Sequence, residues 1–252
     1  VYGGTLHPWD GRAPRVLDDS GLFEGGVEQV AARWAGGAWS TVAMVVQPRR
    51  AKRLLARGTT EAGDWEHRFT EPGGGAIDAQ GNVACTPGGT RVVRVDSHGQ
   101  VSSDRPLPEG IVIEQLVAVA DALVAVDVDR RRLHTLSAEG AVQSTVTVPL
   151  AMAGPTVTGP GLRRYAVGEG IAAVEDGRIL WSKIANVALH VTCLGADGVL
   201  VAGGARLCHY DHEGTLRSER STPDRSAIVA PPAPAPDGTL YLATASGVFA
   251  LR

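Results

Sequence analysis

The chain has 252 residues, of which 44% are hydrophobic, so it can bury the core of one large domain or two small ones. A formal net charge of −3 without a long basic run argues against nucleic acid or an anionic membrane as a partner. No apolar run approaches the roughly 18 residues of a membrane-spanning helix. The 32 glycines and 15 prolines indicate many turns rather than long helices.

The termini and the cysteines bear on cellular context. The chain begins with Val rather than Met, which leaves open a processed leader or further domains in a longer polypeptide. Cys85, Cys193 and Cys208 each stand singly in an apolar run, without the CxxC spacing of a zinc site. Their odd number argues against a disulfide framework and favours a reducing compartment such as the cytoplasm.

The first predicted elements are strands. Residues 4–17 are β-like and include a turn at HPWD, residues 7–10. Residues 26–37 carry a weak helical pattern, but we predict a strand there because Gly-Gly ends the segment and the following residues, AWSTVAMVV, strongly favour β structure.

From residue 75 onward the sequence repeats a pair of hairpins. One hairpin has an apolar strand, an acidic residue, a Gly and a second strand; its copies are 91–103, 132–145, 171–183 and 206–218. Another hairpin precedes it, with copies at 75–86, 191–203 and 233–244. Gly accepts the positive φ that such tight turns need. Four strands repeated at roughly 40 residues predict the blades of a β-propeller.

We therefore predict an all-β fold, a single six-bladed β-propeller domain over residues 1–252 with four-stranded antiparallel blades. The predicted blades cover about 22–70, 71–110, 111–150, 151–188, 189–224 and 225–252. The sixth supplies only three strands, so residues 4–17 are expected to add its outer strand and close the ring, because a free edge promotes aggregation. A seven-bladed ring is the alternative.

Residues 227–238, AIVAPPAPAPDG, are dense in proline. Proline cannot donate a hydrogen bond to a sheet ladder. We expect this stretch to form a partly irregular inner strand or a loop over the channel of the propeller.

Short motifs resemble the pyrroloquinoline-quinone type of propeller repeat. They are PDGTLYLATASGVFAL at 236–251 and DGRILWS at 176–182. A Trp recurs in such repeats, and DGRILW is the one segment of this chain that matches that pattern well. The resemblance implies the propeller fold without quinone dehydrogenase activity.

A second resemblance covers residues 72–108, which are similar to a blade of the gluconolactonase and senescence-marker-protein family of six-bladed propellers. Residues 15–26, RVLDDSGLFEGG, resemble the segment that opens that family's first blade. This resemblance implies lactonase-like chemistry with a divalent cation such as calcium, held by Glu24 and Asn186. Gly73 stands where the family has an Asp, and glycine has no side chain that could serve as the metal ligand or base. We expect no cofactor, with the divalent cation as the alternative.

Candidate site residues lie where the inner strands begin. Glu24, Glu114 and His190 form the catalytic set if the protein is an enzyme, because carboxylates and imidazole in one channel can be tuned for acid–base work. Each also fits a solvated loop or a channel lining. Arg225 and Trp39 are the candidates for ligand binding, although Trp39, like Trp34, also suits packing between blades.

The cluster HYDHE at 209–213 resembles a metal site only at first sight. In a strand its histidines would point to opposite faces, and the cluster falls in a predicted hairpin, where Asp and His are common turn residues. We interpret it as a turn.

Two functions follow. The first is a recognition module that binds a small molecule, a peptide or a protein partner at a propeller face or in the channel. The second is a small-molecule hydrolase, lyase or cyclase of the lactonase-like class. An enzyme requires at least three of the candidate side chains to converge, whereas a recognition module does not.

Overall fold

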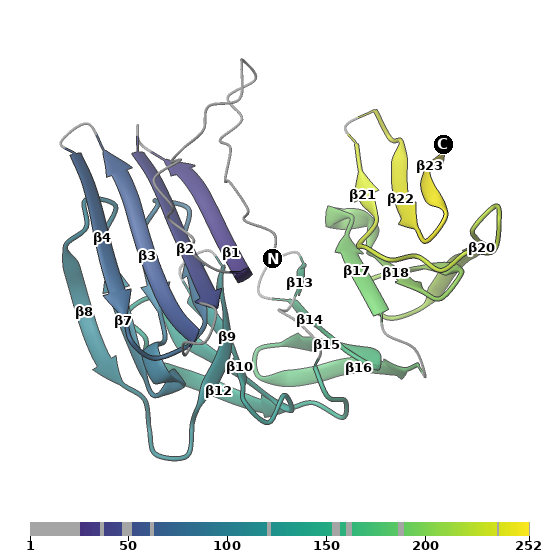
Figure 1. The fold of residues 1–252 in the computed structure, drawn as a ribbon. Helices are drawn as coiled ribbons and strands as arrows, with labels where there is room; N and C mark the ends of the chain where they lie inside the picture. The colour runs from purple at the N-terminus through teal and green to yellow at the C-terminus, as the bar shows by residue number, and fades with distance from the viewer. Residues whose placement is uncertain are drawn as a thin grey trace. The chain divides into compact units, whose positions relative to one another are not determined.

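The computed structural model describes residues 26–35, 38–46, 52–60, 63–119, 122–152, 157–159, 163–185, 189–235 and 237–251. Within them the chain is all-β, with six sheets, five of four strands and one of three (Figure 1). The chain divides into two compact units: unit 1 is Val1–Val128 with Leu136–Val142, and unit 2 is Asp129–Thr135 with Gln143–Arg252.

The first three sheets form in chain order, each strand pairing with the next. The first sheet is β1 (Gly26–Ala35), β2 (Ala38–Val46), β3 (Lys52–Thr60) and β4 (Gly63–Phe69). The second is β5 (Gly75–Ile77), β6 (Val83–Cys85), β7 (Arg91–Val95) and β8 (Val101–Pro106), with the short 3-10 turn η1 (Pro87–Gly89). The third is β9 (Ile113–Val119), β10 (Ala122–Asp127), β11 (Arg132–Ser137) and β12 (Val142–Thr147).

The last three sheets belong to unit 2 and follow the same order. The fourth is β13 (Val157–Thr158), β14 (Arg164–Val167), β15 (Gly170–Glu175) and β16 (Arg178–Ile184). The fifth is β17 (Leu189–Cys193), β18 (Val199–Gly203), β19 (Arg206–Tyr210) and β20 (Leu216–Ser221), with the 3-10 turn η2 (Gly195–Asp197). The sixth is β21 (Ala233–Pro234), β22 (Leu240–Thr244) and β23 (Gly247–Leu251).

In the hairpins at 91–103 and 206–218 the acidic residue builds the turn that the sequence predicted. Asp96 Oδ1 accepts hydrogen bonds from the backbone N–H groups of His98 and Gln100, and Asp211 Oδ1 does the same for Glu213 and Thr215. Such side-chain-to-backbone hydrogen bonds stabilise a turn, because they satisfy backbone N–H groups that have no partner in the sheet there. The turn also needs one left-handed residue, which is Gly99 (φ 84°) in one hairpin and Gly214 (φ 80°) in the other.

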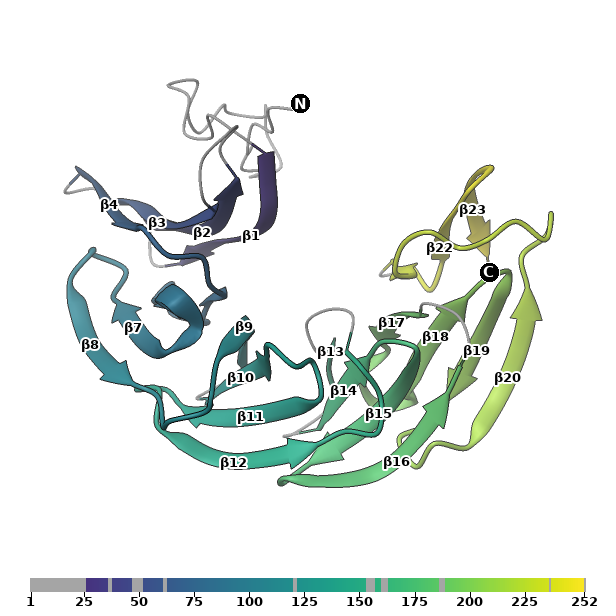
Figure 2. The same ribbon diagram turned by 60° about the horizontal axis from the view of Figure 1, so that its bottom comes forward.

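The core lies in layers between consecutive sheets. In unit 1, one layer joins β3 to β6 and β7 through residues such as Leu54, Val83 and Val93, all nearly inaccessible to solvent. In unit 2, a layer joins the fourth and fifth sheets, which lie side by side in Figure 2; its buried members are Tyr165, Val167, Ile171, Ala173, Val191, Val199 and Val201. Burying one sheet face against the next is what stacks the blades of a propeller.

A tryptophan in the outer strand of one sheet holds the hairpin turn of the next. Trp181 Nε1 donates to the carbonyl of His212 at 2.8 Å, 31 residues away, and its ring covers Gly214. Trp65 makes the same contact, 3.1 Å to the carbonyl of Ser97, 32 residues away, and its ring covers Gly99. Trp181 carries the repeat motif DGRILW, whereas Trp65 has no such motif in the sequence around it.

The contact at Trp181 is reinforced by a buried tyrosine. His212 Nε2 lies 2.8 Å from the carbonyl of Gly195, so Nε2 carries the proton and Nδ1 accepts from the Tyr165 hydroxyl at 2.6 Å. Burial raises the pKa of Tyr165 to about 12, which keeps that hydroxyl a donor. Arg163 joins this cluster, donating to the carbonyl of His212 at 2.9 Å and pairing with Glu175. We call Tyr165, Trp181 and His212 the clamp.

The predicted grouping of strands is confirmed. The six sheets fall inside the six predicted ranges, residues 26–35 form a strand, and HYDHE spans the end of β19 and the hairpin turn that follows it. The last sheet has three strands in the described residues, and the proline-rich stretch contributes only β21 and an isolated bridge between Ile228 and Thr244. Residues 4–17 lie outside the described residues, so the closing strand, the blade count and the single domain stay predictions.

Candidate functional site

The predicted catalytic and metal residues are divided between the two units and the residues outside the described ranges, so this set stays a prediction. Glu114 lies half-buried in β9 of unit 1, and His190 lies half-buried in β17 of unit 2. Glu24 and Asn186 lie outside the described residues. No group of three or more His, Cys, Asp or Glu side chains in the described ranges is placed to hold a metal ion.

Gly73, at the position where the lactonase-like family has an Asp, has a structural reason to be glycine. A Cβ built on Gly73 would lie 1.9 Å from the carbonyl oxygen of Thr86. Thr86 is fully buried and is tied to the neighbouring Gly74 by its backbone N–H and by its hydroxyl. This close approach of two backbones leaves no space for an Asp side chain, so the missing ligand is a feature of the fold.

Trp39 lies in β2, opposite Trp34 of β1 in the register of the first hairpin. Its candidate role in ligand binding stays a prediction. Arg225 follows β20 in unit 2, and the structure places it on the lining of a cavity.

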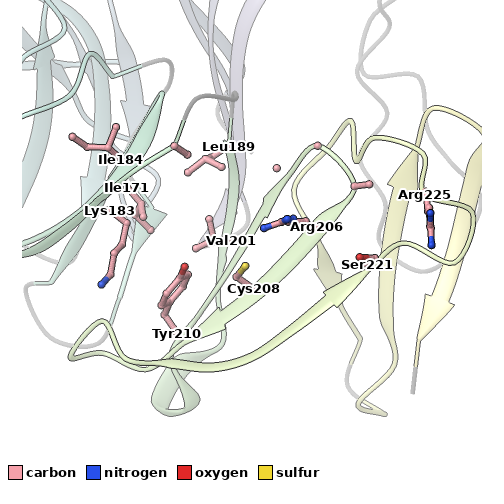
Figure 3. Close-up of a pocket in the computed structure, with 14 residues that line it drawn as sticks. Ile171, Lys183, Ile184, Leu189, Val201, Arg206, Cys208, Tyr210, Ser221 and Arg225 are labelled. Carbon is pink, nitrogen blue, oxygen red and sulfur yellow. The ribbon is translucent and has the colours of Figure 1, made fainter.

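This cavity, of about 510 Å³, lies within unit 2 at one end of the layer between the fourth and fifth sheets (Figure 3). Its walls come from the end of β16, the start of β17, the turn between β18 and β19, and the segment that follows β20. The clamp closes the other end of the same layer. The volume falls in the range of pockets that hold small molecules.

Apolar side chains form the inner wall of the cavity. Ile171 and Val201 are 1% and 6% exposed and belong to the packed layer, and Leu189 packs against it. Tyr210 carries the wall toward Trp181, whose ring centroid lies 6.2 Å from that of Tyr210. A ligand in contact with this wall would lose apolar surface to water, which is the main source of affinity in such sites.

Three cations line the cavity, and none of the fourteen described lining residues is acidic. The three cations are Lys183, Arg206 and Arg225 (Figure 3). Arg206 is paired with Glu219 of the adjacent strand at 3.3 Å. Within the described part of the chain, the side chains of Lys183 and Arg225 have no hydrogen-bond or ion-pair partner.

The turn that carries Arg225 explains why its acidic neighbour does not neutralise it. Asp224 accepts hydrogen bonds from the backbone N–H and hydroxyl of Ser226 and from the hydroxyl of Ser246. These bonds direct the carboxylate toward the β22–β23 turn. Arg225 itself has φ 60°, in the left-handed region, and its N–H donates to the carbonyl of Thr222 at 3.1 Å.

The hydrogen bonds that Asp224 accepts should make the free energy of unfolding depend on pH. The hydrogen bond from Ser246, followed by those from Ser226, lowers the pKa of Asp224 from 3.8 to about 2. A carboxyl group with a lowered folded-state pKa stabilises the fold above its unfolded pKa, and this contribution is lost as the pH falls from about 4 to about 2. We expect Asp224→Asn to unfold at a lower temperature than the wild type at neutral pH and at nearly the same temperature near pH 2. Thermal denaturation at the two pH values checks this, and an equal gap at both would contradict it.

Sequence reasoning proposed Arg225 but missed Lys183, Arg206 and Tyr210. These three belong to strands that pair into two different sheets, and the sequence has no signal that their ends meet around one opening. A positional signal existed for Lys183 alone, because it lies in the last strand before the predicted junction between the fourth and fifth blades, whereas Arg206 and Tyr210 lie in the third strand of the fifth blade.

A second cavity, of about 690 Å³, lies in unit 1 between β8 and the turn before β12. Its lining combines Ser103, Asp104 and Arg105 with prolines and small residues, and its one acidic residue, Asp104, pairs with Arg91 at 2.8 Å. None of its aliphatic lining side chains is buried as Ile171 and Val201 of the unit 2 cavity are.

No protein-family model matches the sequence, and neither does any curated protein. In the described residues no helix is long and apolar enough to span a membrane. Similarity is found among solved structures. A catalytically inactive variant of virginiamycin B lyase from Staphylococcus aureus, solved with quinupristin, has 14% identity and a TM-score of 0.54, covering 90% of this chain and 94% of that chain.

A second similar structure is BBS1N, solved in complex with ARL6DN. It has 12% identity and a TM-score of 0.60, with 98% of this chain and 82% of that chain covered. Both are propeller proteins. At such low identity the likeness shows the fold alone, and the chain is an all-β propeller.

Proposed function

We propose that this propeller is a recognition module and that it binds a small molecule in the unit 2 cavity. One observation carries the proposal: the cavity combines a buried apolar wall with two cations that the described residues leave unpaired. An apolar wall supplies affinity and a few placed charges supply orientation, which is the usual composition of a small-molecule site.

The chemistry of the lining favours binding over catalysis. Neither Asp, Glu nor His, the usual acid–base groups, occurs among the described lining residues. Burial, assisted by the Glu219 carboxylate, raises the pKa of the Cys208 thiol, and burial raises the pKa of the Tyr210 hydroxyl. Both groups therefore stay protonated at neutral pH, and a protonated thiol is a poor nucleophile.

The lactonase-like alternative has less support from the described residues. Glu114 and His190 belong to different units, and the backbone at Gly73 has no space for the carboxylate that the family uses. The proposal therefore includes no cofactor and no divalent cation. The propeller neighbours include a lyase and a protein solved with a protein partner, so the fold is compatible with either function.

A bulky side chain in a surface turn can fill the cavity without a change in the core, and this tests the proposal. Ala205 lines the cavity in the two-residue turn between β18 and β19. We expect Ala205→Trp to weaken binding of the neutral fluorescent probe prodan at least tenfold, measured by the blue shift of its emission. The wild type should bind the probe, because prodan is an apolar molecule of the size that such a cavity accepts.

Ala245→Trp is the matched control. Ala245 occupies the corresponding turn between β22 and β23, is exposed and does not line the cavity. It should bind prodan as the wild type does. Equal binding by Ala205→Trp and Ala245→Trp, or no binding by the wild type, would overturn the proposal.

A further inference from the structure

We infer that the ligand of the unit 2 cavity is a small molecule with an apolar body and a single anionic head group. This inference rests on the proposed function and specifies its substrate class. It depends on which residues share the lining: the buried apolar side chains Ile171 and Val201 line the same cavity as the cations Lys183 and Arg225.

The charges of the lining residues favour an anionic ligand. The Arg206 guanidinium has Glu219 as its counterion at 3.3 Å, so it adds little net charge. Lys183 and Arg225 have no such counterion within the described residues. Asp224, which precedes Arg225 in the chain, accepts hydrogen bonds from Ser226 and Ser246 instead. Two uncompensated positive charges beside a low-dielectric wall attract an anion more strongly than in open water.

The apolar wall excludes a simple inorganic anion as the complete ligand. Ile171, Leu189 and Val201 have no polar side-chain atom, and a hydrated ion gains nothing from contact with them. An aliphatic or aromatic body against this wall leaves its head group to the cations of the same lining, Lys183 and Arg225. The exposed end of the β16 strand, at Ile184, which is 75% exposed, extends the apolar surface on the Lys183 side.

The backbone at Arg225 gives independent support. A φ of 60° favours Gly or Asn, and the hydrogen bond from this N–H to Thr222 needs no particular side chain. Among the described residues, no hydrogen bond or ion pair of the side chain accounts for an arginine at this strained position. A role in binding accounts for it, because strained residues cluster at ligand sites.

The test compares four probes of the same cavity by isothermal titration calorimetry. Octanoate, octan-1-ol and octyltrimethylammonium share an eight-carbon chain and differ in charge, and inorganic phosphate has charge without a chain. We expect octanoate to bind at least tenfold more tightly than octan-1-ol, and the other two to bind more weakly than octan-1-ol. Raising the salt concentration should weaken octanoate and leave octan-1-ol unchanged.

The matched variants are Arg225→Gly and Arg130→Gly. Arg130 is also exposed, has φ 56° and does not line the cavity, so both variants remove one charge and relieve the same backbone conformation. Arg225→Gly should weaken octanoate about tenfold without lowering the unfolding temperature, and Arg130→Gly should leave the affinity unchanged. Arg130→Gly should also leave prodan binding unchanged, because Arg130 does not line the cavity.

The outcomes separate the two proposals. If octan-1-ol binds as tightly as octanoate, or Arg225→Gly keeps the octanoate affinity, while Ala205→Trp still prevents prodan binding, the anionic head group is wrong and the cavity function stands. If neither prodan nor octanoate binds the wild type, both proposals are wrong.

Discussion

Replacing Trp181 with alanine is expected to lower the free energy of unfolding by about 3 kcal/mol, the lower part of the range for large aromatic side chains in cores. The ring lies in the layer between the fourth and fifth sheets, 5.9 Å from the ring of Tyr165, and covers the turn glycine of the next hairpin. Its N–H group also satisfies the carbonyl of His212. Urea denaturation followed by circular dichroism measures the change.

Trp181→Phe is the control that separates packing from hydrogen bonding. It keeps an aromatic ring in the layer and removes the donor to His212, so it should cost about 1 kcal/mol, the net value of one such hydrogen bond. A loss below about 1 kcal/mol in Trp181→Ala would show that the clamp does not hold the two sheets together.

Gly73→Asp is the second substitution with a large expected effect. It restores the carboxylate that the lactonase-like family has at this position, yet its Cβ would meet the Thr86 carbonyl at 1.9 Å. Because the opposing atom belongs to a buried backbone, rotation of a side chain cannot relieve the contact. We expect a loss of about 3 kcal/mol, the upper end of the range for overpacking, in the same urea experiment.

Gly110→Asp is the matched control in the same unit, because a Cβ on Gly110 meets nothing within 4 Å. Its φ of 81° is tolerated by Asp at a cost of about 1 kcal/mol. Equal stability of the two variants, with calcium raising the unfolding temperature of Gly73→Asp, would contradict the steric account and favour the metal-dependent enzyme.

Much of the fold could be predicted because its signals are local. Asp96 with Gly99, and Asp211 with Gly214, specify hairpin turns within five residues, and the alternation of apolar residues specifies the strands between them. Repetition of these signals at a constant spacing then predicts sheets joined in chain order. Trp65 was missed because its partner, the carbonyl of Ser97, lies 32 residues away and has no side-chain signature.

The candidate site could be predicted only in part, because it depends on contacts between sheets. Arg225 was found from its place at the entry to a predicted blade. Lys183 and Arg206 look like ordinary exposed strand residues, and their role appears only when β16 and β19 face one another across the apolar layer. The close approach at Gly73 is likewise invisible in sequence, because Thr86 is thirteen positions away and contributes backbone atoms.

The most direct test of the central claim is a methyl NMR titration of the wild-type protein with octanoate. Selective labelling of isoleucine, leucine and valine methyl groups reports both units in one experiment. We predict that the largest shift changes occur at Ile171, Leu189 and Val201, which line the unit 2 cavity. Shift changes confined to unit 1 methyl groups such as Leu116 and Leu123, or no changes at all, would contradict the claim.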